Sequence, residues 1–172
     1  MSQVEDRVSA EDRLSTLESR IRALEDQLAI NKLLATYGPS VDSRMGGVTA
    51  SLWAEDGSFD FGAAPMVGAQ KVGSLVDIEP HIGYVAAGCA HVISMPHVTI
   101  DRDTAVATGY SCVYIHEGDR WRVERAGANR WDLIRTAAGW RIKRRTNRLL
   151  NGQAEARDLL SNGVAEAAKP PR

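Results

Sequence analysis

Three stretches near the carboxyl end decide the fold of this chain: TAVATGYSCVYIH (residues 104–116), RWRVERAGANRWDLIRT (residues 120–136) and GWRIKRRTNRLL (residues 139–150). In each of them apolar and polar residues alternate with a period of two, which predicts a β-strand. The joints are short and turn-like, so neighbouring strands are expected to run antiparallel. HVISMPHVTI (residues 91–100) predicts a fourth strand, and the four together predict a meander.

Upstream of these strands the sequence predicts helices. Residues 9–37 read as one long helix that starts at Ser9 and carries a narrow a/d stripe of apolar residues; the stripe consists of Leu14, Leu17, Ile21, Leu24 and Leu28. Beyond Ile30 the apolar pattern broadens, as expected where a helix docks on a folded body. Gly38-Pro39 is expected to end or kink the helix, because proline lacks the amide donor and clashes with the preceding turn.

The middle of the chain is less regular. Residues 48–53 predict a short helix and residues 58–61 a short strand. Residues 62–90 are rich in Gly and Ala; we expect a short helix near residues 69–76 and then a loop through Pro80 and Gly83. After Asn151 a short helix over residues 154–160 is expected, and the AEAAKPPR end is expected to be disordered.

Helices followed by an antiparallel sheet are the α+β pattern. We therefore expect one cone-shaped α+β domain over residues 14–150, with a flexible N-terminus (1–13) and a C-terminal segment (151–172) that holds the short helix and the tail. A helix lying across a curved sheet encloses a pocket between them. Side chains at the helix end and on the concave sheet face would then point into one cavity.

Composition excludes several classes of protein. A net charge of −1 gives no electrostatic case for binding nucleic acid or an anionic membrane. The first twenty residues hold no apolar run typical of a signal peptide, and no stretch approaches the roughly 20 apolar residues that cross a bilayer. We expect a cytoplasmic protein. Cys89 and Cys112 belong to no CxxC, and the four histidines lack metal-ligand spacing, so no metal is expected.

Three polar residues stand out as candidates for catalysis. Tyr37 and Asp42 lie five residues apart at the break of the long helix, and His91 opens the strand region. A carboxylate that orients an imidazole makes a general base near neutral pH, and a phenol can donate a proton, so no cofactor is required.

These residues also carry a family resemblance. A helix that ends in Y-x4-D, a W-x-E-D-G turn (residues 53–57), a histidine strand and a meander with a late G-W (residues 139–140) resemble the SnoaL-like branch of the nuclear transport factor 2-like superfamily. The resemblance spans roughly residues 14–150. Within the superfamily the pattern is most similar to cofactor-free lyases such as scytalone dehydratase and bile-acid 7α-dehydratase.

The resemblance implies roles for individual residues. Asp42 and His91 fall on the family's catalytic dyad, Tyr37 on its tyrosine, Asn129 on a strand asparagine and Arg148 on an arginine of the last strand. We also expect Trp53, Tyr110 and Ser111 to contact the substrate. Ser111 stands where scytalone dehydratase has a second histidine, and Val41 replaces a tyrosine beside the aspartate, so scytalone is not the expected substrate.

Each residue also has a structural interpretation. Asp42 could cap a helix or hold a turn, His91 and Tyr37 could belong to the core, Asn129 could be an ordinary strand residue, and Arg148 could be exposed at a strand end. The same parity as Trp140 and Ile142 places Arg148 on the apolar face. The remaining histidines are expected at the surface or in loops; they are His81, His97 and His116.

The expected function is β-elimination, as in a dehydratase, or isomerisation of a hydrophobic cyclic or polycyclic ketone or alcohol. One alternative is a ligand-binding or oligomerisation module without chemistry, because a fold does not fix a function. Another is an aldol-type polyketide cyclase. The narrow leucine stripe predicts a homo-oligomer, for which the resemblance favours a trimer and then a dimer. The alternative is that the stripe packs along its own domain.

Overall fold

The computed structural model describes residues 9–167, so the expectations for the ends of the chain (1–8 and 168–172) lie outside the described residues. The first element is helix α1, Ala10–Asp42. Ser9 caps it, because its hydroxyl oxygen accepts a hydrogen bond from the Asp12 backbone amide (3.1 Å). The expected start of the helix at Ser9 is therefore confirmed.

Helix α1 does not end at Gly38-Pro39, and this corrects the expected boundary. The helix continues for another turn with Pro39 inside it, and the Ser43 amide donates to the Pro39 carbonyl (3.1 Å). Burial of Ser40 and Val41 in this last turn offsets the hydrogen bond that proline removes. The consequence is that Asp42 lies on a helical turn packed against the body and not in a loop.

Short elements follow α1. They are α2 (Gly46–Ser51), β1 (Trp53–Asp60), β2 (Met66–Val67), α3 (Ala69–Gly73), the 3-10 helix η1 (Ser74–Asp77) and α4 (His81–Ala87). The expected helix over residues 48–53 begins earlier, and Trp53 already belongs to a strand. The loop expected through Pro80 and Gly83 is instead α4, which Pro80 precedes in a position that proline tolerates because no helical donor is needed there.

The sheet contains β3 (Cys89–Ile93), β4 (His97–Asp101), β5 (Thr104–Glu117), β6 (Arg120–Thr136) and β7 (Gly139–Leu149). Its strand order is β2-β1-β7-β6-β5-β3, and β4 also pairs with β5. The β5–β7 meander is confirmed. The expected single strand over residues 91–100 is two strands separated around Pro96, because proline offers no ladder donor. The sheet is mixed, since β1 runs parallel to β7.

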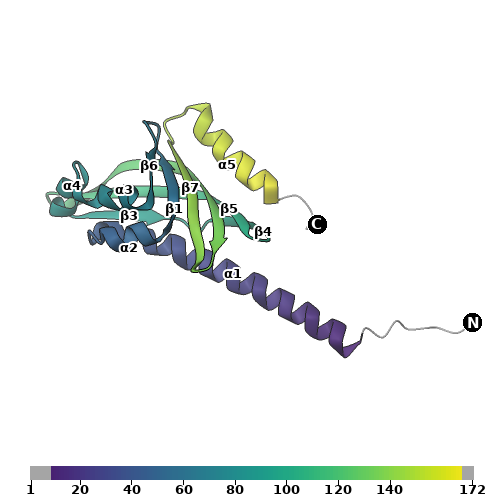
Figure 1. The fold of residues 1–172 in the computed structure, drawn as a ribbon. Coiled ribbons are helices and arrows are strands. Elements are labelled where there is room, and N and C mark those ends of the chain that lie inside the picture. Colours follow the sequence, from purple (N-terminus) through teal and green to yellow (C-terminus); the bar gives the residue numbers. More distant parts are fainter. Residues whose placement is uncertain (1–8, 168–172) are drawn as a thin grey trace, which may run out of the picture.

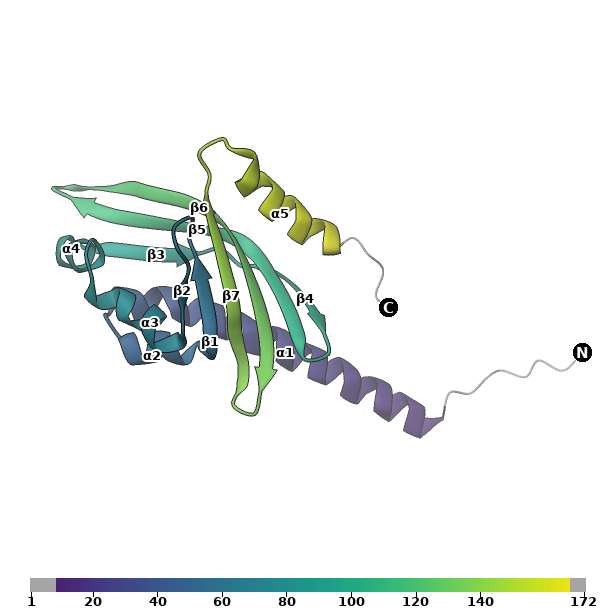
Figure 2. The ribbon, with the colours of Figure 1, turned by 45° about the horizontal axis from the view of Figure 1, so that its top comes forward.

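Two layers cover the curved, open sheet (Figures 1 and 2). The last third of α1 packs on one face, where Ile30 and Leu34 join Trp131 and Leu133 in the core. Helix α5 (Ala154–Ala167) contacts β4, β5, β6 and β7. It lies over the other face, since Thr108 touches α5 whereas its neighbour Ala107 belongs to the core. In both views the first half of α1 projects away from the sheet.

Candidate active site

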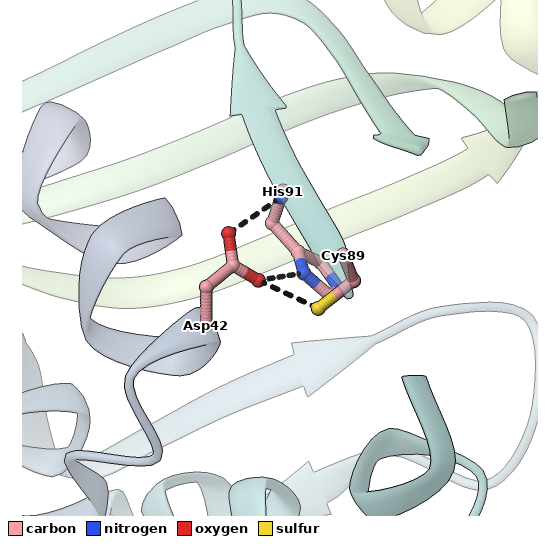
Figure 3. A group of neighbouring side chains, drawn as sticks. All are labelled: Asp42, Cys89 and His91. Carbon is pink, nitrogen blue, oxygen red and sulfur yellow. Dashed lines mark hydrogen bonds and ion pairs between the residues drawn. The ribbon is translucent and has the colours of Figure 1, made fainter. Parts of the chain in front are cut away.

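Asp42 and His91 meet where the end of α1 faces β3 (Figure 3). The His91 ring nitrogen Nδ1 lies 2.6 Å from Asp42 Oδ1, and the His91 backbone amide donates to Asp42 Oδ2 at 2.8 Å. The two side chains are 10% and 22% exposed. The carboxylate therefore fixes both the backbone and the ring of the histidine.

A glycine allows this close approach of helix and strand. A Cβ atom on Gly38 would lie 2.1 Å from the His91 backbone oxygen, well inside contact distance. Glycine, with no side chain, lets the backbones of α1 and β3 come together one turn before Asp42. The helical turn beyond Pro39 then carries the Asp42 carboxylate to His91.

The hydrogen bonds determine the tautomer of His91. A carboxylate only accepts, so Nδ1 carries the proton and Nε2 of the neutral ring is left as a base. Burial raises the pKa of Asp42, but the bonds from the ring and backbone of His91 and from Cys89 outweigh it and hold that pKa below its usual value. Asp42 is therefore an anion at neutral pH and can stabilise an imidazolium.

Cys89 is the third member of this cluster. Its Sγ donates to Asp42 Oδ1 at 3.3 Å, and burial together with that carboxylate raises the pKa of the thiol to about 12. The ligand atoms of Asp42, Cys89 and His91 lie within 4.8 Å of one another and could in principle hold a metal ion. Metals bind the thiolate, however, and here the carboxylate already accepts three hydrogen bonds. The cluster fits proton transfer better than metal binding.

His91 lines a cavity of about 340 Å³ between α1, α4 and the concave face of the sheet. This size lies within the range of small-molecule sites. Most of the wall is apolar, and includes Val41, Phe59, Phe61, Val76, Ile78, Ile93, Val113 and Leu149. The polar groups on the wall include Tyr37, His81, Tyr84, Ser111, Arg125, Arg145 and Asn147. An apolar pocket with a few polar groups suits a small hydrophobic molecule.

Arg145 is the buried charge of this cavity. This residue is only 4% exposed. Its guanidinium lies 4.5 Å from the centre of the Tyr37 ring, and its Nε donates a hydrogen bond to Asn129 Oδ1 (3.0 Å). Burial lowers the pKa of Arg145, an effect that Tyr37 partly opposes. In the described part of the chain no carboxylate pairs with Arg145, and its Nη1 has no hydrogen-bond partner. A buried cation without a counterion is suited to a ligand oxygen that carries negative charge.

The structure brings several of the expected site residues together. Tyr37, His91 and Ser111 line the cavity, and Asp42 supports His91 from behind. Asn129 is fully buried behind the wall. Its amide donates to Ser111 Oγ (2.9 Å), and its oxygen accepts from Arg145, so it orients two wall residues.

Three other expected residues do not line the cavity. Trp53 is 3% exposed and packs on Phe59 in the core, and Tyr110 is 51% exposed on the other face of β5. Arg148 forms an ion pair with Asp60 (2.8 Å) and another with Glu155 (3.3 Å).

A β-bulge explains why strand parity misplaced Arg148. On β6 the inward-facing residues are evenly spaced at every second position: Asn129, Trp131 and Leu133. Their partners on β7 are unevenly spaced: Asn147, Arg145 and Ile142. Lys143 is the extra residue, so the inward-facing positions of β7 change from even to odd numbers. Arg145 consequently takes the inward position on β7 that parity had given to Arg148.

Sequence reasoning missed Arg145, His81 and the role of Cys89. His81 was expected at the surface or in a loop, but it lies on α4 with Nε2 2.8 Å from the Val41 carbonyl and its ring 5.3 Å from that of His91. Cys89 stands two residues before His91, which places both on the same side of a strand, and this spacing was the available signal. No local pattern indicates the bulge that turns Arg145 inward.

This chain also matches the model of a known protein family. A model described as a SnoaL-like domain matches residues 22–146. A comparison with functionally curated proteins gives no match. No helix within residues 9–167 is both long and apolar enough to cross a membrane.

Solved structures give further matches. An NTF2-like protein with a cystatin-like fold from Novosphingobium aromaticivorans is 41% identical, with a TM-score of 0.83 over 86% of this chain and 96% of that one. A protein of unknown function from Mycobacterium tuberculosis is 22% identical, with a TM-score of 0.65 over 81% and 92%. A Catenulispora acidiphila protein in complex with S-DNPA is 21% identical, with a TM-score of 0.64 over 76% and 96%.

Proposed function

Because this chain belongs to the SnoaL-like family of the nuclear transport factor 2-like superfamily, we propose that it is a cofactor-free lyase or isomerase with His91 as its general base. The substrate class is a hydrophobic cyclic or polycyclic ketone or alcohol. The observation that carries the proposal is the 2.6 Å contact between His91 Nδ1 and Asp42 Oδ1, with the histidine on the cavity wall.

The first step is removal of a proton from a carbon next to a carbonyl. Nε2 of His91 takes the proton, the C–H electron pair forms an enolate, and Asp42 stabilises the resulting imidazolium. In an elimination the enolate electrons then expel a hydroxyl from the β-carbon, and the imidazolium or Tyr37 protonates it as water. In an isomerisation the same proton returns to another carbon.

Arg145 supplies the charge that this step needs. An enolate carries negative charge on oxygen, and a buried guanidinium without a counterion stabilises that charge more strongly than it stabilises the neutral ketone. Asn129 accepts a hydrogen bond from Nε of Arg145 and so orients the guanidinium, whose buried Nη1 has no hydrogen-bond partner among the described residues. Tyr37 lies against the same guanidinium, so its phenol and Arg145 share one side of the cavity.

The wall of the cavity supports the proposed substrate class. A mostly apolar cavity of about 340 Å³ favours a compact ring system over an extended or highly charged molecule. The structural neighbour in complex with S-DNPA supports binding of a small molecule by this fold.

Deuterium exchange tests the proposed first step without knowledge of the natural substrate. A panel of cyclic and polycyclic ketones is incubated with the protein in D₂O, and loss of the α-proton signals is followed by NMR. We expect exchange of one or more members, and a loss of about 10²-fold or more in His91→Ala, since general base catalysis contributes about that much. His97→Ala, an exposed position on β4, is the matched control and should retain exchange.

Two outcomes would overturn the assignment. One is unchanged exchange in His91→Ala. The other is thermal stabilisation by a ketone with no exchange in the wild type, which would identify a binding module. Product mass then separates elimination, which loses water, from an aldol cyclisation without dehydration, which does not.

A further inference from the structure

The first half of α1 carries an apolar stripe that its own domain does not cover. Leu14, Leu17, Ile21, Leu24 and Leu28 are between 51% and 70% exposed. Contiguous exposed apolar side chains of this kind mark an interaction surface. The stripe follows heptad spacing, with Leu14, Ile21 and Leu28 at a positions and Leu17 and Leu24 at d positions.

The domain occupies the opposite side of the same helix. In this heptad frame the buried residues Ile30, Leu33 and Leu34 take positions c, f and g. At another f position, the Asp26 carboxylate accepts hydrogen bonds from Arg135 (2.7 Å) and from Trp140 Nε1 (3.0 Å) of the β6–β7 hairpin. These contacts turn the exposed a/d stripe away from the body. The first half of α1 projects beyond the sheet (Figure 2).

Charges beside the stripe specify the partner. The g positions hold Arg13 and Arg20, and the following e positions hold Glu18 and Glu25. In a parallel pair of identical helices each g residue faces the next e residue of its partner, so arginine meets glutamate. In an antiparallel pair g faces g and e faces e, so like charges would meet.

We propose that a second copy of this chain covers the stripe, and that residues 13–28 of the two copies form a parallel two-stranded coiled coil. Leucine at both d positions, together with the β-branched Ile21 at the central a position, favours two strands over the trimer that the family resemblance implies. The two bodies then lie on the outer sides of the seam, because each packs on the c/f/g side of its own helix.

The segment is short for a coiled coil, but its helix is already nucleated. The free-energy cost of nucleating an isolated helix does not arise for residues 13–28, because the buried last third of α1 anchors this helix to the folded domain. The ion pair between Glu18 and Arg22 (3.7 Å) is highly exposed and therefore weak, so Glu18 can turn to a partner arginine.

The molar mass in solution tests whether the stripe is the interface. Light scattering at micromolar concentration should give the mass of two chains for the wild type and of one chain for Leu24→Asp, because the change buries a charge in the seam. Ala23→Asp introduces the same charge one residue away at an exposed c position and should stay a dimer. A monomeric or trimeric wild type, or a dimeric Leu24→Asp, would overturn the proposal.

A disulfide tests the orientation. In the parallel pair the two Leu14 positions face each other, so Leu14→Cys should form a covalent dimer on mild oxidation. In an antiparallel pair an a residue faces a d residue of the partner, so Leu14 faces Leu24, and the two cysteines would lie about 15 Å apart at 1.5 Å per residue. Ser19→Cys, at an exposed f position, is the control and should remain uncrosslinked. Absence of a Leu14→Cys cross-link in a protein that has the mass of a dimer would refute the parallel arrangement.

Discussion

Asp42 is the residue on which the geometry of the candidate site depends. Its two oxygens accept from the His91 amide, the His91 ring and the Cys89 thiol, so one carboxylate connects α1 to two positions of β3. Each of these donors needs an acceptor. Replacement of the carboxylate by an amide of the same size therefore changes the hydrogen bonds and the charge of the site more than its shape.

Asp42→Asn should reduce α-proton exchange by about 10²–10⁴-fold. The asparagine amide can donate to Nδ1, which moves the ring proton to Nε2 and leaves the cavity side of His91 without a base. Asp60→Asn is the control, since Asp60 pairs with Arg148 outside the cavity. Exchange in D₂O measures both variants, and equal losses would contradict a specific role for Asp42.

The same carboxylate should make stability depend on pH. The pKa of Asp42 is lower in the folded protein than its ordinary value of about 3.9 in an unfolded chain. The carboxylate therefore stabilises the fold above that value, and the contribution disappears as the pH falls through the folded pKa. Urea midpoints of the wild type and Asp42→Asn should differ at pH 6, and the difference should shrink as the pH falls below about 3.9. A difference that does not shrink below this pH would show that the effect is not the charge of Asp42.

Arg145→Met should separate function from stability. A buried unpaired cation costs free energy, so the thermal midpoint should stay level or rise, whereas turnover should fall by about 10²–10³-fold with the loss of enolate stabilisation. Arg148→Met removes an arginine of the same strand that pairs with Asp60 and Glu155, and its turnover should change little. Full turnover in Arg145→Met would remove Arg145 from the mechanism.

At the scale of elements, the contact between α1 and β3 builds the site. It depends on Gly38, where the two backbones approach most closely, and on the helical turn that continues past Pro39. Two glycines in neighbouring helices provide a matched comparison, because one lies in this contact and the other faces open space.

Gly38→Ala should lower the free energy of unfolding by about 1–3 kcal/mol, as overpacking does, and should reduce turnover by moving His91 from Asp42. Gly47→Ala in α2, with no atom within 4 Å of the added Cβ, should be neutral or stabilise by about 0.5–1 kcal/mol. Urea unfolding and the exchange assay report the two effects. A stable and fully active Gly38→Ala would show that the contact has room.

At the scale of the molecule, the two faces of the sheet have different roles. The concave face and α1 enclose the cavity, while α5 covers the outer face without contributing a lining residue. Stability and chemistry can therefore be altered separately through α5.

Gly163→Leu should destabilise the fold by about 1–3 kcal/mol and leave the exchange rate per folded molecule unchanged. A Cβ at Gly163 would lie 2.1 Å from Thr108 Oγ1, so the larger side chain pushes α5 from the sheet. Asn162→Leu, which places leucine at an exposed neighbouring position, is the control. A loss of exchange in Gly163→Leu that exceeds the loss of folded protein would mean that α5 supports the cavity.

The sequence by itself determined the elements whose pattern is local. Alternation between Thr104 and Leu149 predicted β5, β6 and β7 almost to the residue, because each strand residue shows its face through its own polarity. The heptad stripe favoured self-association but left open its packing on the domain, and the order of motifs predicted the family and the approach of Asp42 to His91.

Tertiary structure alone decided which side chains enter the cavity. The bulge at Lys143 turned Arg145, and not Arg148, toward the cavity. Burial of Ser40 and Val41 stabilised the helical turn of α1 beyond Pro39. Helix α4 placed His81 on the cavity wall. The physical reason is the same in each case. Local periodicity describes one element at a time, whereas a one-residue shift in register or an added helical turn is stabilised by contacts with distant parts of the chain.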